Sequence, residues 1–237
     1  VMSGGAVATA CEALGERAKR IGASLLQAEE SDVRIEGGSV VAPNNAISLT
    51  DIAHVWYLKP QDLPSDVDPS GLEVTVGYKP QVDTGTFSYA AHAALVAVDK
   101  ETGHVEIIDY VVVEDGGILV NPMIVDGQVY GGTIQGIGTA LYEEMVFDDR
   151  GQPLASTFAD YLLPGTAEAP DIRVFHMETP SPYTRFGQKG IGESGAIGPP
   201  AAIGNAVNDA LREYGAEIHE LPITPRRVLE ALREAKL

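Results

Sequence analysis

The chain has 237 residues, of which 44% are hydrophobic, and its formal net charge at pH 7 is −18. This hydrophobic fraction suffices for an ordinary buried core, which argues against intrinsic disorder. The negative charge argues against nucleic acid and anionic membrane surfaces as partners, because their phosphates would be repelled. No apolar run approaches the length of a membrane span and no signal peptide is visible, so we expect a cytoplasmic protein.

The first part of the sequence predicts a helix, a small hairpin and a second, short helix. Apolar residues at helical spacing run from about residue 5 to residue 29. The adjacent glycines Gly37 and Gly38 predict the turn of a hairpin. Ser48 is suited to cap a short helix that runs through Val55.

A composition change separates this part from the rest of the chain. The stretch KPQDLPSDVDPSG, residues 59–71, is proline-rich and acidic, as surface loops and linkers are. We therefore expect one region over residues 1–71, which continues an upstream domain, and a second over residues 72–237. The single cysteine, Cys11, excludes an internal disulfide framework and any cysteine-cluster metal site.

The second region predicts strands and helices that do not alternate regularly. Strand patterns occupy residues 72–80, 92–99, 104–115 and 171–179, and helical patterns begin at Asn121-Pro122, at Pro199-Pro200 and at Thr224-Pro225. The turn at residues 101–103 predicts a hairpin between the second and third of these strands. The fold class we expect is α+β, with mixed or antiparallel sheets and packed helices.

The helix that follows Asn121 is unusually rich in glycine. It contains Gly127, Gly131, Gly132, Gly136 and Gly138. Each glycine costs about 1 kcal/mol relative to alanine inside a helix. Two explanations stay open: the small residues admit another backbone or a bulky ligand, or they break the helix locally.

The stretch GQKGIGESGAIGPP, residues 187–200, has glycines at the spacing of a dinucleotide-binding turn. In that interpretation, however, Glu193 would repel a pyrophosphate, and the surrounding chain lacks regular strand-helix units. A second interpretation is a glycine-rich connection in which Glu193 is merely solvated. A third is a tightly packed loop that fixes Glu193 beside a bound group, where a carboxylate can serve as a general base.

Several of these motifs together resemble one known family. In order along the chain, DGGILVNPMIVDGQVYGGTIQGIGTALYEE, ETPSP and GQKGIGESGAIGPPAAIGNAVNDAL are similar to the C-terminal part of the molybdenum-binding large subunit of the xanthine oxidase family. The likeness is strongest to large subunits of the aerobic carbon-monoxide-dehydrogenase type, and it extends from the SGGAV segment to the last helix.

The resemblance implies roles for five residues. Glu193 would be the catalytic base, next to molybdenum held by molybdopterin or by its cytosine dinucleotide form. Gln128 would bind the pterin, and Lys189, Gly190 and Gly192 would belong to the cofactor-contacting loop. The implied reaction is the oxidation of an aldehyde, an N-heterocycle or a similar small substrate by water-derived hydroxylation. Its electrons would leave through an iron-sulfur subunit and an FAD subunit.

The chain departs from the family in length, because such a subunit is roughly three times longer. We therefore expect a partner that supplies the upstream half of the molybdenum subunit, as a separate chain or segment. A second hypothesis is a non-catalytic assembly or scaffold chain that kept the fold without a working molybdenum site. The presence of both Glu193 and Gln128 argues against the second hypothesis, since a scaffold needs neither.

Overall fold

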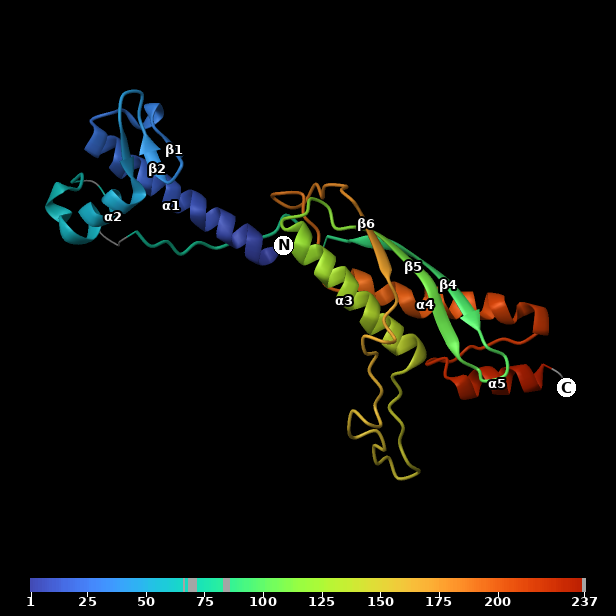
Figure 1. The fold of residues 1–237 in the computed structure, drawn as a ribbon. Coiled ribbons are helices and arrows are strands. Elements are labelled where there is room, and N and C mark those ends of the chain that lie inside the picture. The colour runs from blue at the N-terminus through green and yellow to red at the C-terminus, as the bar shows by residue number, and fades with distance from the viewer. Residues whose placement is uncertain (66, 68–71, 83–85, 236–237) are drawn as a thin grey trace. The chain divides into compact units, whose positions relative to one another are not determined.

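A computed structural model describes residues 1–65, 67, 72–82 and 86–235 of the chain, which divides into two compact units, Val1–Asp83 and Thr84–Leu237 (Figure 1). The boundary expected between residues 71 and 72 falls next to residues outside the described part. The structure groups residues 72–82 with the N-terminal unit. In that segment a strand was expected, but the described residues form extended chain without a sheet partner.

The N-terminal unit packs two helices on a small antiparallel sheet. Its elements are α1 (Met2–Leu26), β1 (Arg34–Glu36), β2 (Ser39–Val41), β3 (Ala46–Ser48) and α2 (Leu49–Leu58), with 3-10 turns at Glu30–Asp32 and Pro60–Asp62. The hairpin turn at Gly37-Gly38 is confirmed, with positive φ at both glycines. Ser48 caps α2, because its side chain accepts a hydrogen bond from the Asp51 amide.

The core of this unit lies where α1 crosses the sheet. The buried side chains there are Ile21, Ala23, Val33, Val40, Ala42, Ile52 and Trp56. A Cβ at Gly22 would lie 2.7 Å from the Val40 side chain, so glycine allows the helix to approach β2 this closely. The segment 72–82 also follows α1: Arg17 donates to the Glu73 carbonyl, and the ring of Tyr78 occupies the space beside Gly5.

The C-terminal unit contains a three-stranded mixed sheet with helices on one side. Its elements are β4 (Tyr89–Val98), β5 (Val105–Asp115), α3 (Pro122–Leu141), β6 (Ile172–Met177), α4 (Ser194–Leu211), a 3-10 turn at Arg212–Tyr214 and α5 (Pro225–Glu234). β4 and β5 form the expected hairpin, and β6 adds to β5 in parallel. The α+β fold with mixed sheets is confirmed. Caps at Asn121 and Thr224 start α3 and α5 where the sequence predicts.

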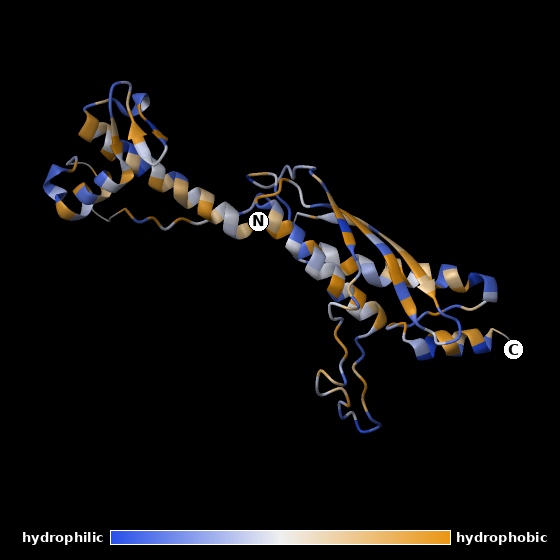
Figure 2. Cartoon of the chain, in the orientation of Figure 1, coloured by the Kyte–Doolittle hydropathy of each residue, from blue (hydrophilic) through white to orange (hydrophobic). Residues whose placement is uncertain are grey.

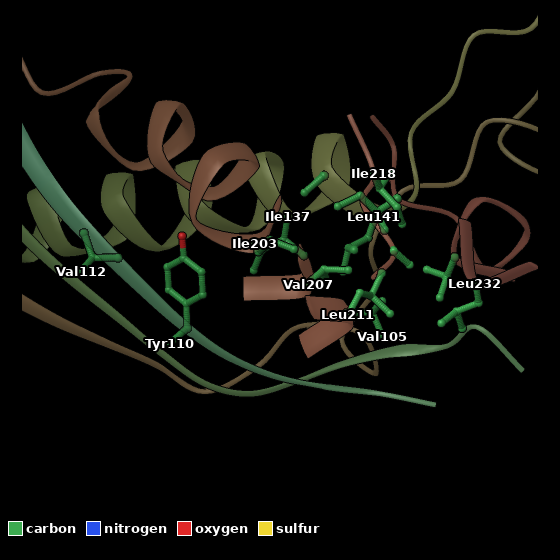
Figure 3. Packing of buried hydrophobic residues seen from close by; sticks show 14 of the residues in the cluster. Val105, Tyr110, Val112, Ile137, Leu141, Ile203, Val207, Leu211, Ile218 and Leu232 are labelled. Atoms are coloured by element: carbon green, nitrogen blue, oxygen red, sulfur yellow. The ribbon is translucent and has the colours of Figure 1, made fainter. Parts of the chain in front are cut away.

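Helix α4 packs on both the sheet and α3, and the main core lies between these elements. Figure 3 shows Val105 of β5 among apolar side chains of α3, α4 and the C-terminal helix, with Tyr110 farther along the same strand. The fully buried residues include Ile137 of α3 together with Ile203 and Val207 of α4.

Helix α4 begins earlier than the sequence predicts. Proline is common in a first helical turn, so the expected start was near Pro199 and Pro200. The helix instead starts at Ser194, and both prolines lie inside it. The third glycine of the motif, Gly195, is therefore helical. A Cβ there would lie 2.5 Å from the Val129 carbonyl oxygen, so the close packing of α4 on α3 requires glycine.

The other face of the C-terminal sheet carries uncovered apolar side chains. Leu95 of β4 and Phe175 and Met177 of β6 are each more than half exposed, and Figure 2 shows the hydrophobic colour along these strands. No helix in the described part of the chain is long and apolar enough to cross a membrane.

Candidate functional site

The loop that carries Glu193 is fixed at its first end by an ion pair. The Lys189 ammonium lies 3.0 Å from Asp115 Oδ1, and both side chains are almost completely buried. The Lys189 amide donates to the Gly116 carbonyl over 2.8 Å, and its ammonium lies 4.4 Å from the centre of the Tyr89 ring. Lys189 thus ties the loop to the end of β5.

Several hydrogen bonds stabilise the ionised form of Asp115. Burial by itself would raise the pKa of this carboxyl. Hydrogen bonds from Thr179, from the Gly117 amide and from Lys189 outweigh that effect and hold the pKa of Asp115 well below its usual range. In turn, burial would lower the pKa of Lys189, but Asp115 raises it. Both groups are therefore charged at neutral pH.

The second end of the loop is held by a buried network. The Ser194 hydroxyl, at the start of α4, faces two acceptors, Glu114 Oε2 and the Ile191 carbonyl oxygen, each at 3.2 Å. Glu114 Oε1 lies 2.9 Å from Nδ1 of His176, on β6, and Nε2 of the same ring lies 2.7 Å from Asp126 Oδ1, on α3. A series of contacts from α3 through β6 and β5 therefore ends at Ser194, the residue that follows Glu193.

The protonation of His176 is set by competing effects. Burial alone would lower the pKa of the imidazole. The hydrogen bonds and negative charges of Asp126 and Glu114 outweigh burial, so the pKa of His176 is raised. Each ring nitrogen of His176 faces a carboxylate oxygen, so the protonated ring can donate to Glu114 and Asp126 at once and offset the cost of burying Glu114, whose side chain is inaccessible to solvent.

A further contact reaches the loop from α3. The amide Nε2 of Gln128 donates to the Gly192 carbonyl over 2.7 Å. Glu193 therefore lies between two held residues, and its own carbonyl accepts from the Ala196 amide over 3.0 Å. The side chains of Gln128 and Glu193 are exposed.

The surface around these two side chains is made of open glycines. A Cβ added at any of the four would meet no atom within 4 Å: Gly127, Gly131, Gly190 and Gly192. The glycines of α3 that face α4 behave differently, because Gly132 and Gly136 are in close contact with α4. Helix α3 is continuous through all of its glycines, so they do not break it.

The structure thus brings all five predicted site residues to one place: Gln128 on α3, and Lys189, Gly190, Gly192 and Glu193 on the loop. The dinucleotide interpretation gains no support from the fold. β6 ends at Met177, and an irregular stretch separates it from α4, whereas a dinucleotide turn directly follows its strand.

Sequence reasoning missed the residues behind the loop, which are Glu114, Asp115, Asp126, His176 and Ser194. The histidines are scattered along the chain without the spacing of a metal site. A usable signal was present in VVVED, because two acids that end an apolar strand must be paired if they are buried. Their partners lie about 60 to 80 residues away in sequence.

Comparison with known proteins gives a consistent result. The sequence matches the family profile of the molybdopterin cofactor-binding domain over residues 1–170. It is 39% identical to the nicotine 6-hydroxylase large subunit of Paenarthrobacter nicotinovorans, over 98% of this chain and 29% of that protein. It is 31% identical to the carbon monoxide dehydrogenase large chain of Hydrogenophaga pseudoflava, over 100% of this chain and 29% of that protein.

Solved structures agree. Quinoline 2-oxidoreductase from Pseudomonas putida 86 superposes with a TM-score of 0.87 at 38% identity, over 99% of this chain and 30% of that one. The Cu,Mo-containing CO dehydrogenase gives a TM-score of 0.86 at 29% identity, with 99% and 29% covered. The chain thus spans less than a third of the length of these relatives.

Proposed function

The chain belongs to the molybdopterin cofactor-binding domain family, and we propose that it forms the C-terminal part of the catalytic large subunit of a molybdenum hydroxylase. The observation that carries this proposal is the contact between Gln128 and Gly192, which places Gln128 of α3 beside the Glu193 loop. The resemblance of the sequence assigns Gln128 and Glu193 to the same cofactor, although they are 65 positions apart.

The residues present fit a large, flat cofactor. Gln128 uses one amide hydrogen on Gly192, and a primary amide also offers a carbonyl acceptor and a second hydrogen to a pterin. The open glycines Gly127, Gly131, Gly190 and Gly192 let a ligand approach the backbone without meeting a side chain. Molybdenum held by the pterin would supply the two-electron oxidation of the substrate.

In this proposal Glu193 acts as the general base. It is an exposed carboxylate at the N-terminus of α4, and the residues on both sides of it are held by Gln128 and Glu114. A base must lie within hydrogen-bonding reach of the proton that it takes, so a fixed backbone on both sides favours the reaction. Lys189 contributes by holding the loop to Asp115 rather than by contacting the substrate.

The remainder of the large subunit is the first partner that we propose. Relatives carry more than twice as much additional chain, and the exposed apolar face of β4, β5 and β6 is of the kind that such a partner covers. An iron-sulfur subunit and an FAD subunit would then accept the electrons, in a cytoplasmic complex. The substrate class is an aldehyde or an N-heterocycle, and the cofactor is molybdopterin or its cytosine dinucleotide.

Glu193→Gln tests the proposal in the assembled complex. We expect turnover of quinoline, nicotine or an aldehyde to be abolished while the molybdenum content stays within about twofold of wild type, because the amide keeps the shape but cannot accept the proton. Glu213→Gln, at an exposed acid distant in sequence, is the control. Full activity of Glu193→Gln would refute the base, and loss of molybdenum would make the residue structural. Metal analysis of the native complex tests the scaffold hypothesis, which requires no molybdenum.

A further inference from the structure

We propose that Glu114, His176 and Ser194 are positioning residues that hold the backbone of Glu193 against α3 and β5, so that its side chain leaves the loop from one fixed position. The inference deepens the proposed function, because it rests on Glu193 as the base. It concerns residues that lie behind the loop and to which the family resemblance assigns no role.

The two ends of the loop are held by consecutive residues of one strand. Asp115 binds Lys189, and Glu114 binds Ser194. Successive side chains of a strand point to opposite faces, so β5 holds the loop from both of its faces. Between these two anchors lie four residues, of which Gly190 and Gly192 have no side chain to restrain them.

Glu193 itself has no side-chain cap at α4. Its position therefore depends on its neighbours. Gln128 holds the Gly192 carbonyl on one side, and Glu114 holds the Ser194 hydroxyl on the other. The Ser194 carbonyl also lies 3.3 Å from Nε2 of His92. A glycine precedes Glu193 and a hydrogen-bonded serine follows it. Glycine alone would leave this backbone flexible, but the hydrogen bonds of the folded chain restrain it.

A second connection joins α3 to the residues that flank Glu193, and it runs through His176. Asp126 and Gln128 stand two residues apart on α3, and Asp126 reaches Glu114 through His176. The helix that presents Gln128 is thus joined to both residues that flank Glu193. A change in the α3–β6 contact would move the two proposed cofactor-contacting side chains relative to each other.

Burial supports a geometric role for Glu114. A buried carboxylate contributes little net stability even when paired, compared with an apolar side chain of similar size. What the carboxylate gives instead is two directed acceptors, one for His176 and one for Ser194. In Glu114→Gln the amide oxygen can still accept from His176, and the amide nitrogen can donate to the Ser194 oxygen while the Ser194 hydroxyl donates to the Ile191 carbonyl, so both contacts can persist without the charge.

Amide exchange in the full chain tests the positioning without any substrate. The Ala196 amide donates to the Glu193 carbonyl, so its exchange reports the opening of this segment. We expect about tenfold faster exchange in Ser194→Ala and at least as much in Glu114→Ala, and little change in Glu114→Gln. The matched control is Asp109→Asn, which removes another β5–β6 side-chain pair, between Asp109 and Arg173.

Unchanged exchange in Ser194→Ala would overturn the inference, and so would an equal acceleration in Asp109→Asn. Ser194→Ala removes a hydroxyl that faces both Glu114 and the Ile191 carbonyl. Faster exchange in Ser194→Ala together with wild-type exchange in Glu114→Ala would assign the restraint to Ile191 and would also overturn the inference. If Glu114→Ala does not fold, Glu114→Leu takes its place, because an apolar side chain of similar size is tolerated where a buried charge is removed.

Kinetics of the assembled holoenzyme with quinoline or nicotine separate positioning from stability. For Ser194→Ala we expect kcat to fall about tenfold, with KM within about twofold and molybdenum content unchanged, since a misplaced base affects the reaction rather than substrate binding. Glu114→Gln should recover most of the kcat that Glu114→Ala loses. Equal losses in both would show that the charge matters and the geometry does not. If Glu193→Gln keeps full turnover, the proposed function fails, whereas the exchange result stands by itself.

Discussion

Around the Glu193 loop, residues on one side are packed against other residues of this chain, whereas those on the other side are open. The packed side consists of Asp115 with Lys189, Glu114 with Ser194, and the glycines Gly132 and Gly136 against α4. The open side consists of Gly127, Gly131, Gly190, Gly192 and the exposed side chains of Gln128 and Glu193. A glycine lowers the stability of helix α3 equally on both sides. Only on the packed side does close contact with α4 offset that loss within this chain.

The comparison separates the glycines that allow close packing within this chain from those that leave room for a ligand or a partner. On the packed side, a Cβ at Gly136 would lie 2.7 Å from both the Ala196 carbonyl oxygen and the Pro199 side chain. On the open side, a Cβ at Gly131 would meet nothing within 4 Å. Substitutions on the two sides should therefore affect different properties of the protein.

The largest expected effect is that of Asp115→Asn, which breaks the buried pair on the packed side. Loss of one partner leaves Lys189 charged and uncompensated, so we expect unfolding to become easier by about 3 kcal/mol at pH 7. The lowered pKa of Asp115 makes this pH-dependent: its contribution is complete above the unfolded pKa of about 3.9 and is lost as the pH falls through the folded value.

Chemical denaturation of wild type and Asp115→Asn between pH 3 and pH 7 measures this difference. The difference should be constant above about pH 5 and should shrink below about pH 4. A difference that stays the same down to pH 3 would show that the charge of Asp115 does not support the loop.

Gly136→Ala should have the next largest effect. The added methyl group overlaps the α4 backbone, and overpacking of this kind costs about 1–3 kcal/mol even though alanine is the better helix former. Thermal unfolding of the isolated chain measures the loss. Wild-type stability in this variant would mean that α3 and α4 are not in close contact.

Gln128→Ala should weaken cofactor retention by about 1–3 kcal/mol, because it leaves a hydrogen-bonding group of the pterin without a partner. In the isolated chain the substitution also removes the hydrogen bond to the Gly192 carbonyl, so the free energy of unfolding should fall by about 0.5–1.5 kcal/mol. Molybdenum content after dialysis of the complex measures the first effect. Unchanged metal content and activity would contradict the assignment of Gln128.

The smallest effect on the chain is expected from Gly131→Ala, the matched partner of Gly136→Ala on the same helix. With no atom in its way, the methyl group should stabilise the isolated chain by up to about 1 kcal/mol. In the complex the same methyl group would obstruct whatever approaches the open side, so molybdenum content or assembly should fall. Stabilisation in both states would show that nothing contacts α3 at this position.

Much of this molecule could be predicted from local patterns. Asn121 and Thr224 begin their helices, Gly37-Gly38 turns its hairpin, and the β4–β5 hairpin forms around its predicted turn, because capping and turn chemistry act over a few residues. The predicted start of α4 was wrong because it relied on such a local signal, the two prolines. Packing of Gly195 on α3 extends the helix to residues before them.

The sequence by itself determined the fold class, the family resemblance and the identity of the proposed base, since GIGESG sets an acid among glycines. Only the tertiary structure decided what holds that acid. Glu114, His176 and Asp126 come from a strand, a second strand and a helix, and no spacing along the chain relates them. Buried charges find their partners across space rather than along the chain, because burial leaves them no water to bind.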